Sequence, residues 1–171
     1  MFELMLMRHA KSDWNILTAD IDRPLSQRGR RDAARMGLYL KQHKLVPDRM
    51  VISAAQRARE TADLLLNHLS VADKNRIIDK ELYLADSGTL CDIIELYALD
   101  NKRLLLLAHN PGMDELVSYL ASEPPPLSAG GKLMTTCAVA CFQMDSLATL
   151  NKPGRGKLKQ LIRPKEITDS A

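Results

Sequence analysis

Residues 4–15 read LMLMRHAKSDWN, in which a short apolar run stops abruptly at two basic side chains. Such a run is long enough for one buried strand of a parallel sheet and too short for a helix. Arg8 and His9 follow it directly, and Ser12 and Asn15 come next without further apolar periodicity. The pattern predicts a buried strand with reactive side chains at its carboxyl end. Taken alone, however, the Arg-His pair could equally solvate the exit of a strand.

The same arrangement recurs twice along the chain. Four leucines at 104–107 lead into His109 and a Pro-Gly pair that can turn into a helix, and a third apolar run, Met-Val-Ile, leads into a segment that contains Arg57. In an open, mostly parallel sheet, ligands bind in the crevice outside the carboxyl ends of the strands. We therefore expect Arg8, His9, Arg57 and His109 to converge on one pocket. The alternative for His109 is a core histidine behind its leucine run.

Such a cluster has the chemistry of a phosphate site with a nucleophile, because guanidinium groups match phosphate oxygens and imidazole can attack phosphorus. If His9 is the nucleophile, one ring nitrogen must be unprotonated while the other donates, for example to a backbone carbonyl. Arg8 and Arg57 would favour the neutral ring and neutralise phosphoryl oxygens, while Ser12 and Asn15 add neutral hydrogen bonds. We expect the pocket to hold a tetrahedral oxyanion, since these cations have no carboxylate in their motifs.

Alternating strand and helix patterns predict an α/β fold, a three-layer sandwich with a mostly parallel central sheet and helices on both faces. The expected strands are 2–7, 50–53, 77–79, 104–108, 136–144 and 157–162, and the expected helices are 26–43, 56–69, 88–99 and 113–121. The last two strands should form an antiparallel hairpin. Consecutive prolines make 123–131 a loop. We expect a single domain over 1–163 and a mobile tail over 164–171, which has little to bury.

The composition of the 171 residues is ordinary for a globular soluble protein, with 46% apolar and 26% charged residues. No apolar run approaches the length of a membrane span, and the first one is too short for a signal peptide. The expected location is therefore cytoplasmic, without a membrane partner. The net charge of +3 is small, and its basic clusters lack interleaved aromatic residues, so no nucleic-acid partner is expected.

The sequence predicts neither a metal nor a cofactor. The two candidate site histidines have no adjacent carboxylate or cysteine at metal-ligand spacing, and the glycines at 130–131 lack the residues that complete a phosphate-binding loop. Cys91, Cys137 and Cys141 have no paired spacing and lie among apolar residues. We expect them to be buried free thiols.

Residues 8–15 resemble the signature of the histidine phosphatase superfamily, which includes the cofactor-dependent phosphoglycerate mutases. The family motif Arg-His-Gly-Glu-Ser-x-x-Asn matches this stretch at identical spacing. Ala10 and Lys11 are departures, because the family motif has Gly and Glu there.

Three further motifs follow in the order of the family. Residues 25–33 are similar to Leu-Thr-x-x-Gly-x-x-Gln-Ala, residues 53–62 to Ser-x-x-x-Arg-Ala-x-x-Thr-Ala, and His109 matches the later family histidine. The resemblance spans residues 4–112. The short length and the Arg-Pro-Leu at 23–25 look most like the small SixA-type phosphohistidine phosphatases.

The resemblance implies a phosphoglycerate mutase-like fold and a metal-independent phosphatase that forms a phosphohistidine on His9, which water then hydrolyses. The residues implied to be catalytic or to bind phosphate are Arg8, His9, Ser12, Asn15, Arg23, Arg57 and His109. Arg23 could equally be an ion-pair partner within its loop. Larger members use a glutamate as general acid after the third strand, and Glu81 is the nearest match, with a solvated loop carboxylate as the alternative.

The implied partner is a phosphorylated substrate, either a phosphohistidine on a protein or a small phosphate ester. One alternative is a small-molecule phosphomonoesterase or a mutase, although a mutase needs a larger enclosing insertion to exclude water. Another is a non-catalytic phosphate-binding regulatory module, in which Ala10, Lys11 and a missing acid have removed turnover. Turnover of an aryl phosphate without metal would separate the enzyme from the module.

Overall fold

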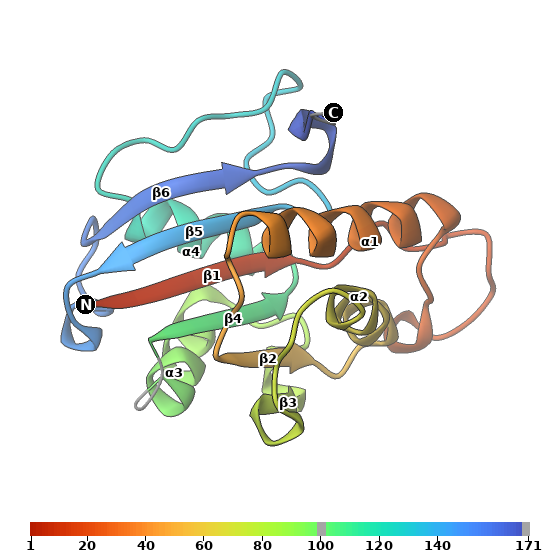
Figure 1. Ribbon diagram of the computed structural model, residues 1–171, viewed down its shortest axis with the longest axis horizontal. Helices are drawn as coiled ribbons and strands as arrows, with labels where there is room; N and C mark the ends of the chain where they lie inside the picture. Colours follow the sequence, from red (N-terminus) through yellow and green to blue (C-terminus); the bar gives the residue numbers. More distant parts are fainter. Residues whose placement is uncertain (99–101, 169–171) are drawn as a thin grey trace.

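One mixed sheet forms the centre of the computed structural model, which describes residues 1–98 and 102–168. Its strand order is β3-β2-β4-β1-β5-β6 (Figure 1). The strands are β1 (Phe2–Arg8), β2 (Arg49–Ser53), β3 (Arg76–Asp79), β4 (Arg103–Ala108), β5 (Val139–Met144) and β6 (Gly156–Ile162). The first four pair in parallel, whereas β5 runs antiparallel to β1 and β6 antiparallel to β5. The predicted mostly parallel sheet and its C-terminal hairpin are confirmed.

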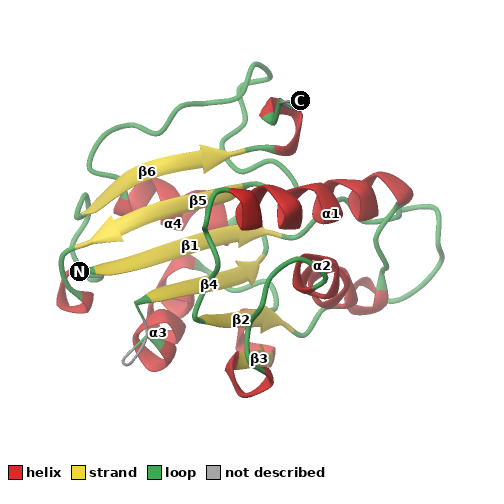
Figure 2. Ribbon diagram, in the orientation of Figure 1, coloured by secondary structure: helices red, strands yellow, loops and turns green. Residues whose placement is uncertain are grey.

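Two layers of helices cover the two faces of the sheet (Figures 1 and 2). The helices are α1 (Gln27–Gln42), α2 (Gln56–Leu66), α3 (Ser87–Tyr97) and α4 (Gly112–Leu120). On β1, Leu4 and Leu6 pack in an apolar cluster with α3 and α4, whereas Met5 and Met7 pack in a second cluster with α1 and α2. Strand β1 is apolar on both faces because helices bury each face. The predicted three-layer sandwich is confirmed.

Some element boundaries differ from the prediction. The strand expected from residue 136 begins only at Val139, because Cys137 has a φ of 66° that turns the chain. The helix expected over 56–69 ends at Leu66. The helix expected to reach Leu99 is α3, and Leu99 lies outside the described residues. The loop over 123–131 has no helix or strand, in agreement with its prolines.

The cysteines agree with the expectation from the sequence. Cys91, Cys137 and Cys141 are free and buried. Burial raises the pKa of the Cys91 thiol to about 11 and that of the Cys141 thiol to about 12, so neither is a reactive thiolate at neutral pH. Among the helices that the structure describes, none is both long and apolar enough to cross a bilayer. The cytoplasmic location stays a prediction.

The segment that follows β6 packs against α1. Pro164 begins a short 3-10 helix and is buried, and Ile167 contacts the apolar cluster beneath α1. The Arg35 guanidinium on α1 donates to the carbonyls of Pro164 and Ile167, at 3.4 and 2.5 Å. The expectation that this segment has little to bury is therefore wrong for Pro164. Residues 169–171 lie outside the described residues, and the mobility of the tail stays a prediction.

Gly29 marks the closest approach of α1 to the loop after β1. A Cβ at Gly29 would lie 2.0 Å from the carbonyl oxygen of Lys11, which accepts hydrogen bonds from the Ser26 N–H and hydroxyl. We expect Gly29→Ala to lower the free energy of unfolding by about 1–3 kcal/mol, because backbone must move. In the matched control Gly88→Ala the nearest atom would be 3.6 Å away, so this variant should be neutral or more stable. Urea unfolding measures both, and equal midpoints would contradict the close approach.

Candidate active site

The predicted site residues meet at the carboxyl edge of the sheet. β1 ends at Arg8 and continues into His9, β4 leads into His109, and β2 ends just before Arg57 in the first turn of α2. Because β4 lies between β1 and β2, these three strand ends are neighbours. They border a cavity of about 280 Å³, the histidine pocket. The residues that line it are Arg8, His9, Lys11, Ser12, Trp14, Asp20, Arg23, Arg57, Leu84, His109, Asn110 and Thr136.

The ring of His9 is held with one nitrogen as donor and the other as acceptor. Nδ1 lies 2.7 Å from the carbonyl oxygen of Ala10, and since a carbonyl only accepts, Nδ1 must carry the proton. Nε2 accepts a hydrogen bond from Nε of Arg57 at 3.3 Å. The lone pair of Nε2 therefore faces the cationic side of the pocket. This tautomer, with the proton on Nδ1, is the one that a nucleophile needs.

His109 faces His9 across the pocket, with ring centroids 5.1 Å apart. Its Nδ1 lies 3.5 Å from Nη2 of Arg57, and because arginine only donates, Nδ1 accepts. Its Nε2 then donates to Oγ of Ser53 at 2.7 Å. The Tyr83 ring packs against it nearly at a right angle, with ring centroids 5.6 Å apart. His109 is therefore buried and oriented, but it lines the pocket and is not solely a core residue.

Both pocket histidines are neutral at physiological pH. Burial lowers the pKa of His9 to about 3, and the neighbouring charges of His109, Arg57 and Arg8 act in the same direction. Burial, with Arg57 beside it, lowers the pKa of His109 to about 4. The Nε2 lone pair of His9 is thus available without prior deprotonation.

These low pKa values make the stability of the fold depend on pH. An unfolded histidine has a pKa near 6.5, so between about pH 4 and 6 the unfolded chain binds more protons than the folded one. The free energy of unfolding should therefore fall as the pH falls through this window, by about 1.4 kcal/mol per pH unit for each of His9 and His109. Urea unfolding across the window measures the slope. His109→Asn should reduce the slope, and an unchanged slope would contradict the assignment.

Thr61 joins the chain after His9 to the helix that carries Arg57. Its buried hydroxyl donates to the carbonyl of Arg57 at 2.7 Å and accepts from the N–H of Ala10 at 3.1 Å. In the sequence, Thr61 and Ser53 stand out only as motif positions. In the structure, Thr61 fixes the backbone of the residue that orients the nucleophile, and Ser53 holds His109.

Arg23 is a pocket residue and an ion-pair partner at once. It is buried, with 7% of its surface exposed. Its Nε donates to Oγ of Ser12 at 3.0 Å, and its guanidinium carbon lies 3.6 Å from the ring centroid of Trp14. Its Nη1 donates to Oδ1 of Asp20 at 2.6 Å. The ion pair within the loop is therefore present, and the phosphate contact of Arg23 stays a prediction.

A carboxylate lies between the pocket arginines, contrary to the prediction. Besides its bond from Arg23, Asp20 accepts from Nη2 of Arg57 at Oδ2, at 3.1 Å, and the Tyr83 hydroxyl donates to the same oxygen. These bonds, that from Tyr83 above all, hold the pKa of Asp20 well below its usual range. Asp20 reaches the arginines because the polar loop over 11–24 folds back over the pocket, and the binding of a tetrahedral oxyanion stays a prediction. No motif distinguishes Asp20 from its loop neighbours.

Asn15 and Glu81 lie away from the lining of the histidine pocket, as the structure describes it. Asn15 is exposed, and its N–H donates to Oδ1 of Asp13 at 2.9 Å. Glu81 is exposed after β3, where its N–H donates to Oδ1 of Asp79 at 2.9 Å. Local turns thus present both residues to solvent. The arrangement does not support the predicted phosphate contact of Asn15 or the role of Glu81 as general acid.

Arg8 and Asn110 share an acceptor in the pocket wall. Nη1 of Arg8 and Nδ2 of Asn110 donate to the carbonyl of Met134, at 3.0 and 3.1 Å. Nε of Arg8 is buried and has no hydrogen-bond partner among the described residues, and burial lowers the pKa of Arg8. Such a donor costs free energy unless a ligand satisfies it, so Arg8 is suited to an anion. Asn110 was missed, although its place before Pro-Gly at a helix start was a signal.

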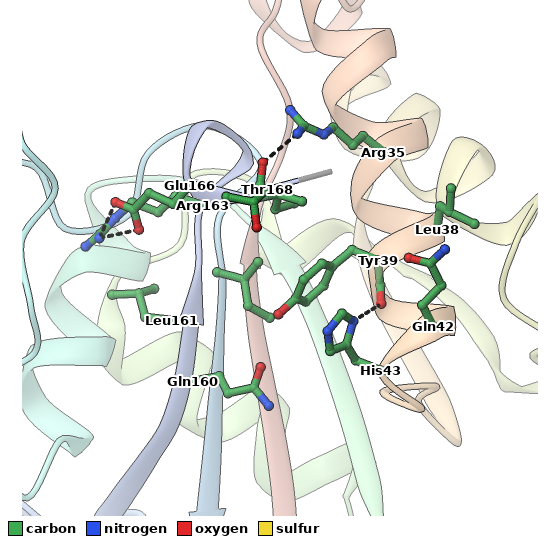
Figure 3. Close-up of a pocket in the computed structure, with 12 residues that line it drawn as sticks. Arg35, Leu38, Tyr39, Gln42, His43, Gln160, Leu161, Arg163, Glu166 and Thr168 are labelled. Atoms are coloured by element: carbon green, nitrogen blue, oxygen red, sulfur yellow. Dashed lines mark hydrogen bonds and ion pairs between the residues drawn. The ribbon is translucent and has the colours of Figure 1, made fainter. Parts of the chain in front are cut away.

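A larger cavity, of about 580 Å³, lies between α1 and β6 (Figure 3). Tyr39 stacks on His43 at one side of it, with ring centroids 3.8 Å apart, and Arg163 pairs with Glu166 at another. Among the described residues, its lining shares none with the histidine pocket. In the part of the chain that the structure describes, no group of three His, Cys, Asp or Glu side chains could hold a metal ion.

Comparisons with known proteins agree with this geometry. The model of the histidine phosphatase superfamily (branch 1) matches residues 4–90. An uncharacterised chloroplast protein of Arabidopsis thaliana is 30% identical, over 94% of this chain and 77% of its own length. An uncharacterised protein of Mycobacterium tuberculosis is 36% identical, over 68% of this chain and 70% of its own.

Among solved structures, the fold is similar to that of the protein histidine phosphatase SixA complexed with tungstate. The TM-score is 0.79 and the identity 24%, over 96% of this chain and 98% of that chain. The predicted phosphoglycerate mutase-like fold is thus confirmed. The family model and the relative from Arabidopsis thaliana together show that this chain belongs to the histidine phosphatase superfamily.

Proposed function

We propose that this chain is a metal-independent phosphatase that acts through a phosphohistidine on His9. The Nε2 lone pair attacks phosphorus, and the bond from phosphorus to the leaving group breaks. Arg8, Arg23 and Arg57 neutralise the phosphoryl oxygens. Water then attacks the phosphohistidine, the phosphorus–nitrogen bond breaks, and phosphate and the free ring are released. The supporting observation is the hydrogen bond from Nδ1 to the Ala10 carbonyl, which directs Nε2 toward Arg57.

The substrate we propose is phosphohistidine on a protein, because of its leaving group. Expelling an alkoxide requires a positioned acid, typically worth ~10² to 10⁴-fold. The carboxyl of Asp20 is ionised, since its pKa lies below its usual range, and burial and Asp20 raise the pKa of the Tyr83 hydroxyl. Neither is a ready proton donor. The ring of a phosphohistidine can take its proton from solvent and then leaves easily as imidazole, so a pocket without a carboxylic acid can still process phosphohistidine.

Glu81→Gln tests whether the exposed carboxylate takes part. We expect kcat/KM on a phosphohistidine peptide to change by less than about 2-fold, because the side chain lies away from the pocket lining. Steady-state assays on the variant and on the control Glu123→Gln, another exposed carboxylate, measure this. A loss of the full ~10² to 10⁴-fold would make Glu81 the working acid and would remove the basis for the proposed substrate.

The proposed function is tested by comparing specificity constants for phosphohistidine, phosphotyrosine and sugar phosphate substrates in the presence of a chelator. Highest values with phosphohistidine, unaffected by the chelator, support the proposal. Highest values with a sugar phosphate support a small-molecule phosphomonoesterase or mutase instead. Binding of all substrates without turnover supports a regulatory module. We assign the activity to a single domain over residues 1–163.

A further inference from the structure

A second cavity, the basic groove, adjoins the histidine pocket. Its volume is about 550 Å³, and it shares Arg8, Lys11 and Thr136 with the histidine pocket. The charged side chains that line it are Arg8, Lys11, Arg28, Asp32, Lys132, Arg163, Lys165 and Glu166. The groove therefore borders the proposed phosphoryl-transfer site and is large enough for a further part of a substrate.

The carboxylates of the basic groove are already paired within it. Asp32 lies 3.7 Å from Nε of Arg28, one turn earlier on α1. Glu166 accepts from Nη1 of Arg163 at 3.2 Å, a pair that Figure 3 shows. Within each pair the two charges cancel, so the net charge of the groove comes from its other side chains.

That remaining charge is positive. Lys132 and Lys165 are exposed, and Lys11 is partly buried at the junction with the histidine pocket. Among the described residues, none of these three lysines forms an ion pair with a carboxylate. Arg8, at the same junction, has its buried Nε without a partner. Lys11 also stands where the family signature has a glutamate, so the junction carries an ammonium group in place of a carboxylate.

We propose that the basic groove binds a second anionic group, a phosphate or a carboxylate, that the substrate carries beyond the phosphoryl group it gives up. The proposal rests on the proposed function, since it assigns the groove to the same substrate. Several unpaired cations around one concave surface attract anions and raise their local concentration. The hydroxyls of Ser128, Thr135 and Thr136 in the same lining can donate to the anion.

Two pairs of substrates test this, and each pair differs only in the second anion. The first pair is a phosphohistidine peptide with acidic flanking residues and the same peptide with the matching amides. The second is an aryl phosphate with a carboxylate side chain and its methyl ester. We expect the acidic member of at least one pair to have a KM lower by about 5-fold or more, and raising the salt concentration should erode the difference.

The double variant Lys132→Ala/Lys165→Ala should reduce this preference, by about 2- to 5-fold for each lysine, through KM and not kcat. The matched control is Lys74→Ala/Lys152→Ala, two exposed lysines outside the groove, which should keep the preference of the unaltered protein. A preference confined to the peptides assigns the groove to a protein substrate, and one confined to the aryl phosphates assigns it to a small molecule.

Turnover of both members of each substrate pair with equal KM would contradict the proposed anion site in the basic groove and would leave the proposed function standing. A preference that survives the double variant would also contradict that site. If no substrate is turned over, the proposed function fails. The ratio of Kd values within each substrate pair then decides whether the groove binds a second anion. Equal Kd values would then reject it, and tighter binding of the acidic members that is lost in the double variant would support it.

Discussion

Replacing His9 by alanine should abolish phosphoenzyme formation and lower kcat/KM by at least about 10³-fold with every phosphorylated substrate. His9 supplies the attacking Nε2, and its Nδ1 bond to the Ala10 carbonyl has no counterpart in alanine. Rapid quenching after mixing with a ³²P-labelled substrate measures the intermediate, which should be acid-labile and alkali-stable as expected for a phosphorus–nitrogen bond.

His43→Ala is the matched control, because His43 is exposed and stacks on Tyr39 away from the histidine pocket. This variant should form the phosphoenzyme normally. If His9→Ala still formed an acid-labile phosphoenzyme, the nucleophile would be another histidine, and His109 would be the first to test because its ring lies 5.1 Å from that of His9.

Replacing Asp20 by asparagine should tighten the binding of inorganic phosphate or vanadate by about 10-fold or more. The Asp20 carboxylate accepts from Arg23 and Arg57, the same donors that a phosphate would use. Two anions compete for these donors, and an amide removes the negative charge of the competitor. With 44% of its side chain exposed, Asp20 has room to move aside when phosphate binds. Competitive inhibition by phosphate, measured with an aryl phosphate substrate, gives the affinity.

Asp22→Asn is the matched control for this prediction. Asp22 lies in the same short 3-10 helix as Asp20 and is exposed, but it does not line the histidine pocket. Its replacement removes the same charge from the same loop and should leave phosphate affinity within about 2-fold. Weaker phosphate binding in Asp20→Asn would mean that Asp20 positions the arginines and does not compete with the substrate.

The fold was predictable because its signals are local in the sequence. Each central strand is a short apolar run that is bounded by polar residues, and a strand buried on both faces needs no alternation. Ser26 caps α1 as its Oγ accepts from the N–H of Gly29 at 3.1 Å. The positive φ of Cys137, which delays the start of β5, has no such local signal, because only contacts of the folded chain maintain it.

The four central site residues were predictable for a topological reason. Arg8, His9, Arg57 and His109 each follow an apolar run, and parallel strands bring their carboxyl ends to one edge of the sheet. Asp20 was not predictable in this way. It lies in a loop of irregular structure, where no periodicity relates its position in the chain to its position in space.

The sequence alone determined which side chains stand at the ends of the strands, and therefore the family of chemistry that the site can perform. Only the tertiary structure decided how these side chains are held. The proton on Nδ1 of His9 depends on the Ala10 carbonyl at 2.7 Å. The hydrogen bond from Arg57 to Asp20 depends on a loop that folds over the pocket. Hydrogen bonds and burial act over a few ångströms between residues far apart in the chain, so their outcome is set by packing and not by sequence spacing.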